Sequence, residues 1–105
     1  MTNIIMLSTC SDLAEAKKIA KAVVERRLAA CVNIFPVHSI FRWKESIEES
    51  DEQLLVIKTR STLFKKASEC VKSLHSYEVP EIISTEIKQG SRPCLKWVKD
   101  SVRKG

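Results

Sequence analysis

Glycine and proline are scarce in this sequence: its 105 residues include two glycines and three prolines, and no low-complexity tract. Flexible linkers and disordered tails are enriched in such residues and tracts, so no linker is visible. No internal repeat is present either. With 44% hydrophobic residues, the chain is predicted to form a single domain over residues 1–105.

Long apolar runs are also lacking. The chain starts with Met1-Thr2-Asn3 and continues into a short apolar stretch, without a basic leader or a small-residue cleavage site. No later run approaches the roughly 20 apolar residues that are needed to cross a bilayer. We therefore expect a protein that is neither exported nor inserted in a membrane, and a cytoplasmic location.

The sequence has no closely spaced cysteine pair. Cys10, Cys31, Cys70 and Cys94 lie far apart, whereas structural zinc sites and redox motifs use pairs such as Cys-x-x-Cys. This spacing argues against a dense zinc cluster. Secreted disulfide scaffolds usually combine an export signal with a higher cysteine density, so reduced thiols are expected here.

Recognisable catalytic motifs are missing as well. The sequence contains no glycine-rich phosphate loop, no Gly-x-Ser-x-Gly elbow and no metalloprotease helix motif. The net charge of +5 is spread along the chain and is not concentrated in one arm. It favours acidic partners in general and does not identify a ligand.

Apolar residues at helical spacing predict three helices. The first follows Asp12 and Glu15, which have the spacing of a capping box. The second begins near residues 61–62, and the third is opened by Ser91 and Pro93. The expected apolar stripes are Ala16, Ile19, Ala20, Val23, Val24 and Leu28; Phe64, Ala67, Val71 and Leu74; and Leu95, Val98 and Val102.

Four segments rich in β-branched residues predict strands at 4–7, 31–43, 54–57 and 81–88. The resulting order, βαββαβ with a terminal helix, is that of a ferredoxin-like α+β sandwich with the first and third strands in the centre. These two strands are apolar throughout, as expected of strands covered on both faces. Pro36 and Pro80 fall in or beside the other two, where an edge tolerates the missing N–H.

Both faces of the predicted sheet carry apolar side chains. Leu54 and Val56 point to one side, and Leu55 and Ile57 to the other, while the first two helices cover one face only. We expect the second face to be buried against another subunit. Residues 45–52, with five carboxylates, are expected to form an acidic, solvated hairpin end of which part docks on a neighbour. They lack the Asp/Asn and Gly spacing of a calcium loop.

Several segments, in one order along nearly the whole chain, resemble the motifs of the CutA (divalent cation tolerance) family. The resemblance implies a ferredoxin-like fold with an extended hairpin between the second and third strands, and a homotrimer. It also implies a non-enzymatic role linked to divalent metal ions, copper in particular, without an organic cofactor. The segments include Thr9-Cys10-Ser11-Asp12, Ala29-Ala30-Cys31-Val32-Asn33, Phe41-Arg42-Trp43-Lys44, Val56-Ile57-Lys58-Thr59, Tyr77-Glu78-Val79-Pro80-Glu81 and Leu95-Lys96-Trp97-Val98.

The same resemblance implies a ligand cleft between subunits. Some bacterial relatives have a copper site made by a thiol late in the first strand and paired histidines, and the matching places here hold Ser8, Leu74 and His75. Cys10, two residues beyond Ser8, could replace the thiol, so Cys10 and His75 are the candidate metal ligands. The positions that match the cleft are Trp43, Lys58, His75, Tyr77 and Glu81.

Structural interpretations and other functions stay open for these residues. His75 could stabilise a helix C-terminus by interacting with the helix dipole. Cys10 could be a small buried hydrophobe, and Lys58 could pair with Glu81. An enzyme using Cys31 or the group of His75, Tyr77 and Glu81 is the first alternative function. Binding of single-stranded RNA ranks last, because residues 4–7 and 54–57 carry no aromatic side chain for base stacking.

Overall fold

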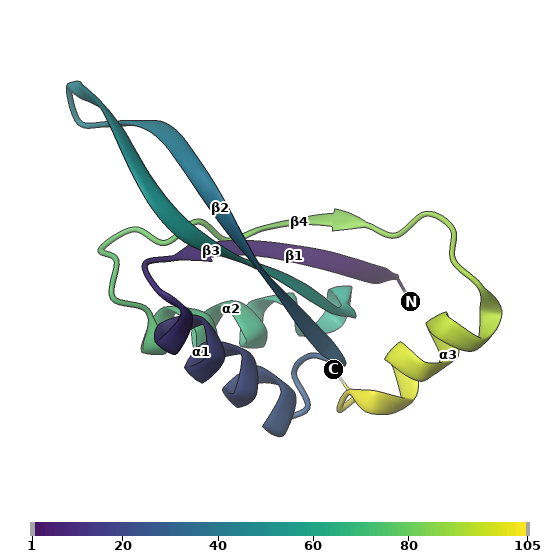
Figure 1. The fold of residues 1–105 in the computed structure, drawn as a ribbon. Coiled ribbons are helices and arrows are strands. Elements are labelled where there is room, and N and C mark those ends of the chain that lie inside the picture. Colours follow the sequence, from purple (N-terminus) through teal and green to yellow (C-terminus); the bar gives the residue numbers. More distant parts are fainter. Residues whose placement is uncertain (1, 105) are drawn as a thin grey trace.

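The computed structural model describes residues 2–104, which form a four-stranded antiparallel sheet and three α-helices (Figure 1). The α+β class and the order of the elements are as the sequence predicted. No helix in the described part is long and apolar enough to cross a membrane. The elements are β1 (Asn3–Cys10), α1 (Leu13–Glu25), β2 (Cys31–Trp43), β3 (Ser46–Arg60), the 3₁₀ turn η1 (Ser61–Leu63), α2 (Phe64–Leu74), β4 (Ile83–Glu86) and α3 (Arg92–Ser101).

The strand order is β2-β3-β1-β4, so the two central strands are the ones predicted from their apolar runs. Pro36 lies in the edge strand β2, opposite Gln53 of β3. Pro80 precedes the other edge strand, β4. Both prolines are therefore placed where the missing N–H leaves no central ladder bond unmade.

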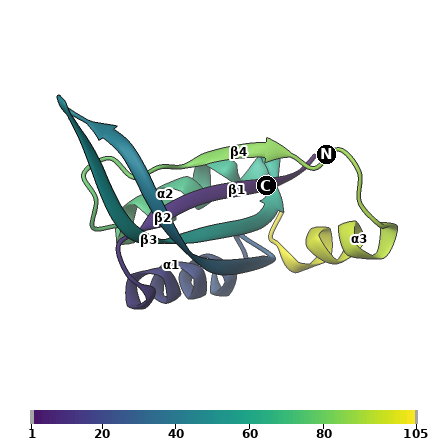
Figure 2. The same ribbon diagram turned by 45° about the horizontal axis from the view of Figure 1, so that its top comes forward.

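The hairpin of β2 and β3 is extended, as the family resemblance implied, and β3 is much longer than the strand 54–57 predicted from the residues. β3 starts at Ser46, so the prediction of a solvated turn over residues 45–52 is wrong for all but its first residue. The two strands pair as far as Trp43 and Ser46, and Lys44 turns the chain with a φ of 56°. Cross-strand pairing with β2 overrides the weak strand propensity of the carboxylates, and the hairpin projects from the body as an arm (Figures 1 and 2).

Two of the three predicted helix starts are confirmed by their caps, whereas the start predicted near residues 61–62 is a 3₁₀ turn and α2 begins at Phe64 without a side-chain cap. Asp12 Oδ1 accepts a hydrogen bond of 2.8 Å from the Glu15 N–H, and Ser91 Oγ accepts one of 3.4 Å from the Cys94 N–H. The capping box is incomplete, however. The Glu15 carboxylate turns to Ser11 Oγ at 2.9 Å and to the Ser76 N–H at 2.5 Å, so it joins the start of α1 to the chain after α2.

The main core lies between the sheet and the helices α1 and α2. Alternate residues of β1 and β3 enter it, and each fully buried aliphatic side chain contributes about 1.5–3 kcal/mol. α3 lies at the end of the sheet opposite the arm and contacts β1 and β3, where its Val98 is buried (Figure 2). The sheet side chains in this core include Ile4, Met6, Cys10, Leu55 and Ile57.

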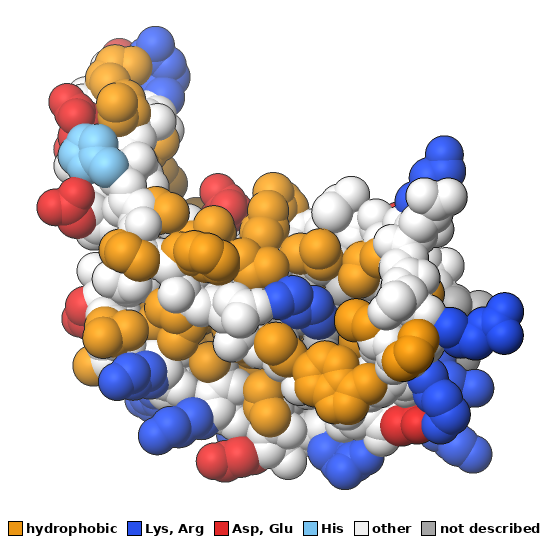
Figure 3. All heavy atoms as spheres, turned by 45° about the vertical axis from the view of Figure 1, so that its right-hand side comes forward, with side chains coloured by type: hydrophobic (Ala, Val, Ile, Leu, Met, Phe, Trp, Pro, Cys, Tyr) orange, Lys and Arg blue, Asp and Glu red, His pale blue; other side chains and the backbone are white. Residues whose placement is uncertain are grey.

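The other face of the sheet is largely uncovered within one chain. Leu7, Leu54 and Val56 are only partly buried there, and Phe35 and Ile83, which share this face through the strand register, are 50% and 54% exposed. Figure 3 shows hydrophobic side chains spread over the surface below the arm. We call this surface the open sheet face.

Candidate functional site

A hollow of about 790 Å³ lies at the base of the arm. Its walls come from the end of β1, from the outer halves of β2 and β3, and from the segment that follows α2. This mixture of apolar and carboxylate side chains is typical of a small-ligand site. The side chains that line it include Phe41, Trp43, Glu48, Glu52, Tyr77, Val79 and Glu81.

Tyr77 and Glu52 form a close polar contact in the wall of this hollow. The Tyr77 hydroxyl donates a hydrogen bond of 2.6 Å to Glu52 Oε2. Glu52 is only 6% exposed, although it lies in the acidic arm. Burial of the phenol and its bond to the carboxylate raise the pKa of Tyr77 far above its usual value. The phenol therefore remains a hydrogen-bond donor at physiological pH.

His75 lies beneath this pair and does not line the hollow. Its side chain is fully buried, Nε2 donates to the Thr9 carbonyl over 2.8 Å, and Nδ1 accepts from the Tyr77 N–H over 3.1 Å. Its ring packs on the Tyr77 ring with 4.8 Å between the centroids. Both ring nitrogens are thus occupied in fixing the segment after α2 to the end of β1.

Cys10 has the surroundings of a core thiol. It is fully buried, and Sγ lies 3.7 Å from the Asp12 carbonyl oxygen. Burial, together with the nearby Glu15 and Asp12 carboxylates, raises the pKa of Cys10 to about 11. The thiol is protonated at neutral pH, whereas a metal binds the thiolate.

Cys10 and His75 therefore do not fit a copper site in this arrangement. Both imidazole nitrogens are used in hydrogen bonds with the backbone, and the Cys10 side chain is fully buried in the core. Among residues 2–104 no group of three or more His, Cys, Asp or Glu side chains is placed to hold a metal ion.

Lys58 lies away from the hollow, on the open sheet face. Its ammonium group contacts Asn33 Oδ1 and lies 3.9 Å from Cys31 Sγ. It does not pair with Glu81 in the described structure. Of the five predicted cleft residues, the fold brings Trp43, Tyr77 and Glu81 to one hollow and leaves Lys58 and His75 outside it.

Glu52 is one of the residues of the hollow that the sequence did not single out. The sequence pattern assigns it to the solvated hairpin end, with four other carboxylates. The available signal is the strand alternation, because Glu52 follows the two-residue period of Leu54 and Val56 on the open face. A strand predicted to begin at residue 52 in place of 54 places the Glu52 side chain on the open face of the sheet.

The fold and the hollow define a small ferredoxin-like protein with a projecting hairpin arm. Residues 4–101 match the family model described as CutA1 divalent ion tolerance protein, and the chain belongs to this family. The resemblance seen in the sequence is thereby confirmed.

Relatives with this name occur in animals, bacteria and archaea. Protein CutA homolog of Xenopus laevis is 53% identical over 95 residues, which cover 90% of this chain and 63% of the relative. Divalent-cation tolerance protein CutA of Thermus thermophilus is 46% identical over 98 residues, covering 92% and 95%. The chain spans about half of the length of the mouse and human relatives.

The solved structures agree closely in fold. The structure titled periplasmic divalent cation tolerance protein CutA from Archaeoglobus fulgidus superimposes with a TM-score of 0.94 at 40% identity, covering 96% of this chain and 99% of that one. An Arabidopsis thaliana relative is named chloroplastic. The names of the relatives therefore do not point to one compartment.

Proposed function

We propose that this chain works as a homotrimeric, non-enzymatic binding protein that holds a metal ion or a small ligand in clefts between its subunits. The open sheet face is the observation that carries this proposal. Contiguous apolar surfaces of this kind mark interaction sites on soluble proteins. We take the partner to be a second copy of the chain. A second copy carries the same apolar sheet face, and membership of the family argues for self-assembly.

The arm gives a second argument for assembly. It extends the molecule to 44 Å against 25 and 21 Å in the other directions. Ile40 and Ile47 near its end are 67% and 60% exposed, and both edge strands keep unpaired backbone groups on their outer sides. Docking the arms on neighbouring sheet edges would cover these groups and close the assembly into a ring.

In such a trimer the hollow at the base of the arm becomes the cleft. Trp43, Tyr77 and Glu81 would face the ligand, and His75 would hold Tyr77 in place from beneath. Lys58, on the open sheet face, would reach a cleft only across a subunit boundary. The Lys58 ammonium group would then attract an anionic group of the ligand.

The metal part of the proposal concerns donors from more than one subunit. Copper is the ion that the family resemblance names, and it prefers thiolate and imidazole ligands. Cys10 and His75 within one chain do not offer them in the described arrangement. We therefore place a bound divalent ion among the carboxylates of the cleft, with Glu52 and Glu81 as the donors from one subunit.

Binding without catalysis is favoured by the state of two of the residues considered for acid–base chemistry. His75 has both nitrogens bonded to the backbone, and the raised pKa of Tyr77 keeps its proton in place. Neither group is poised to exchange a proton with a substrate at neutral pH. The four cysteines are free thiols, which suits a reducing compartment, and the cytoplasm is the location we propose.

Calorimetric titration of the full chain with Zn²⁺ and Cu²⁺ tests the cleft. A Leu54→Glu variant, which places a charge on the open sheet face, should stay folded, become monomeric and lose ion binding. Lys66→Gln, on the exposed side of α2, is the matched control and should bind as the unmodified chain does. Undiminished binding by a folded monomer would contradict a site between subunits.

A further inference from the structure

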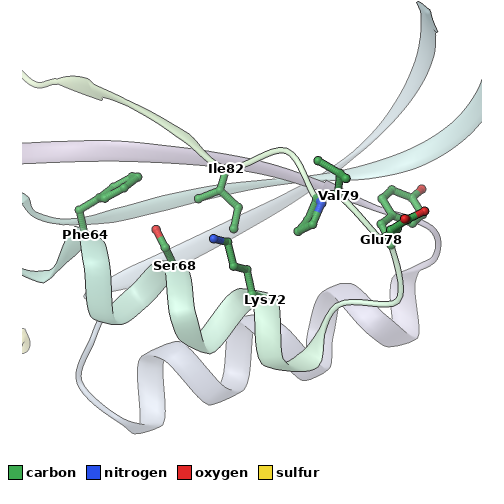
Figure 4. Close-up of a pocket in the computed structure, with 8 residues that line it drawn as sticks. Phe64, Ser68, Lys72, Glu78, Val79 and Ile82 are labelled. Atoms are coloured by element: carbon green, nitrogen blue, oxygen red, sulfur yellow. The ribbon is translucent and has the colours of Figure 1, made fainter. Parts of the chain in front are cut away.

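A second hollow, of about 510 Å³, lies between α2 and the segment that connects α2 to β4 (Figure 4). We call it the α2 groove. It lies beside the helix layer, and the proposed trimer contact uses the other face of the sheet. Its volume is within the range of about 300–1,000 Å³ that is typical of small-molecule sites.

One wall of the α2 groove is a single stripe of the helix. Phe64, Ser68 and Lys72 are four residues apart and so lie on one face of α2. Figure 4 shows their side chains pointing from the helix toward Ile82 and Val79 of the opposite wall. The stripe runs from an aromatic ring through a hydroxyl to a cation.

The Ser68 hydroxyl is an unused polar group in this groove. Ser68 is 8% exposed, and its buried Oγ has no hydrogen-bond partner. Helical serines commonly bond a carbonyl one turn earlier, as Ser73 of the same helix does with the Cys70 oxygen at 2.8 Å. A buried hydroxyl without a partner is unfavourable, so a ligand that pairs with it would gain affinity.

Lys72 supplies the charge. Its ammonium group takes part in no ion pair within residues 2–104. Glu78 also lines the groove, at the end away from Phe64 (Figure 4). Lys72 provides one cation for a single negative charge of a ligand, and the Glu78 carboxylate disfavours a second negative charge.

We propose that the α2 groove binds a small monocarboxylate with an apolar body. The carboxylate accepts hydrogen bonds from Lys72 Nζ and Ser68 Oγ, and the apolar body packs between Phe64 and Ile82. Charge-assisted bonds of this kind are stronger than neutral ones and fix the orientation of the ligand. The α2 groove shares Tyr77, Glu78 and Val79 with the hollow at the base of the arm, but its proposed binding groups, Ser68 and Lys72, do not line that hollow.

Octanoate is a suitable probe, followed by the amide resonances of the ¹⁵N-labelled full chain. We expect saturable shifts at Ser68, Lys72 and Ile82. Lys72→Gln should weaken binding about tenfold and Ser68→Ala about threefold, as expected for the loss of a charged and a neutral hydrogen bond. Lys72→Arg should retain binding, and Lys66→Gln, outside the groove on the same helix, should leave it unchanged.

Three results would overturn the proposal. Shifts that do not saturate, or that occur outside the α2 groove, would show that the groove is not the binding site. An equal loss in Lys72→Gln and Lys66→Gln would show that the overall charge of the helix attracts the probe. Octylamine binding as tightly as octanoate would show that the groove recognises only the apolar chain.

Discussion

The Tyr77 hydroxyl donates a hydrogen bond of 2.6 Å to the Glu52 carboxylate. This contact joins the segment after α2 to the base of the arm. It also places a phenol and a buried carboxylate in the wall of the proposed cleft, and His75 supports it through the Tyr77 N–H. The pair therefore adds a side-chain contact between the base of the arm and the segment that follows α2.

Tyr77→Phe removes the donor and leaves the Glu52 carboxylate buried without it. We expect a loss of about 1–3 kcal/mol in the free energy of unfolding, measured by urea denaturation. The same substitution in a Glu52→Gln background should cost clearly less, because no buried charge is then left unpaired. Equal costs in both backgrounds would mean that the two side chains are not coupled.

The raised pKa of Cys10 predicts that the free energy of unfolding falls at alkaline pH. Its pKa is raised from 9.0 to about 11, so between these values the unfolded chain loses the thiol proton before the folded chain does. The thiol's contribution is complete below pH 9 and declines as the pH rises, by at most about 1.4 kcal/mol per pH unit. Urea denaturation at pH 8, 9, 10 and 10.5 measures this slope.

The control for this slope is Cys10→Ala. The variant is expected to be less stable at every pH because it leaves a cavity in the core, but its stability should fall less steeply above pH 9. Parallel curves for the two proteins would exclude the thiol as the source of the slope.

His38 on the arm should titrate above the ordinary histidine range. Its ring nitrogens lie 2.9 Å from Glu49 Oε1 and 2.8 Å from Asp51 Oδ1, and these two hydrogen bonds raise the pKa of His38 above 6.5. The bonds favour the charged ring and are lost as the pH rises through its pKa. Titration of the ring protons by NMR should show a lower pKa in Glu49→Gln, and high salt should reduce the difference. An unchanged pKa in that variant would contradict the contact.

Ser68 and Ser73 form a matched pair on α2. Ser73→Ala removes a hydrogen bond to Cys70, whereas Ser68→Ala removes a buried hydroxyl that has no partner. The Ser68 variant should therefore be more stable than the Ser73 variant by about 1 kcal/mol in urea denaturation. The reverse order would show that the Ser68 hydroxyl is already satisfied.

The sequence predicted those parts of the fold that depend on local patterns. Asp12 and Ser91 begin helices because their side chains satisfy free N–H groups, and Pro36 lies in an edge strand because it cannot donate. The length of β3 was not predictable in this way. Residues 46–52 have poor strand propensity, and it is their pairing with residues 37–43 of β2 across the hairpin that makes them a strand.

The candidate site was predictable only in part. Matching to family motifs identified Trp43, Tyr77 and Glu81, which the fold brings to the same hollow. The role of His75 depends on the Thr9 carbonyl, 66 positions away, and no pattern near His75 indicates that contact. Such backbone contacts depend on tertiary packing, which spacing along the chain does not reveal.

Sedimentation velocity of the full chain at micromolar concentration tests the central claim, that the open sheet face is covered by further copies of the chain. One chain has a mass of 11.9 kDa, and we expect a single species of three times this mass. Leu54→Glu should shift it to the monomer, and Lys66→Gln should not. A well-folded monomer of the unmodified chain at these concentrations would contradict the account.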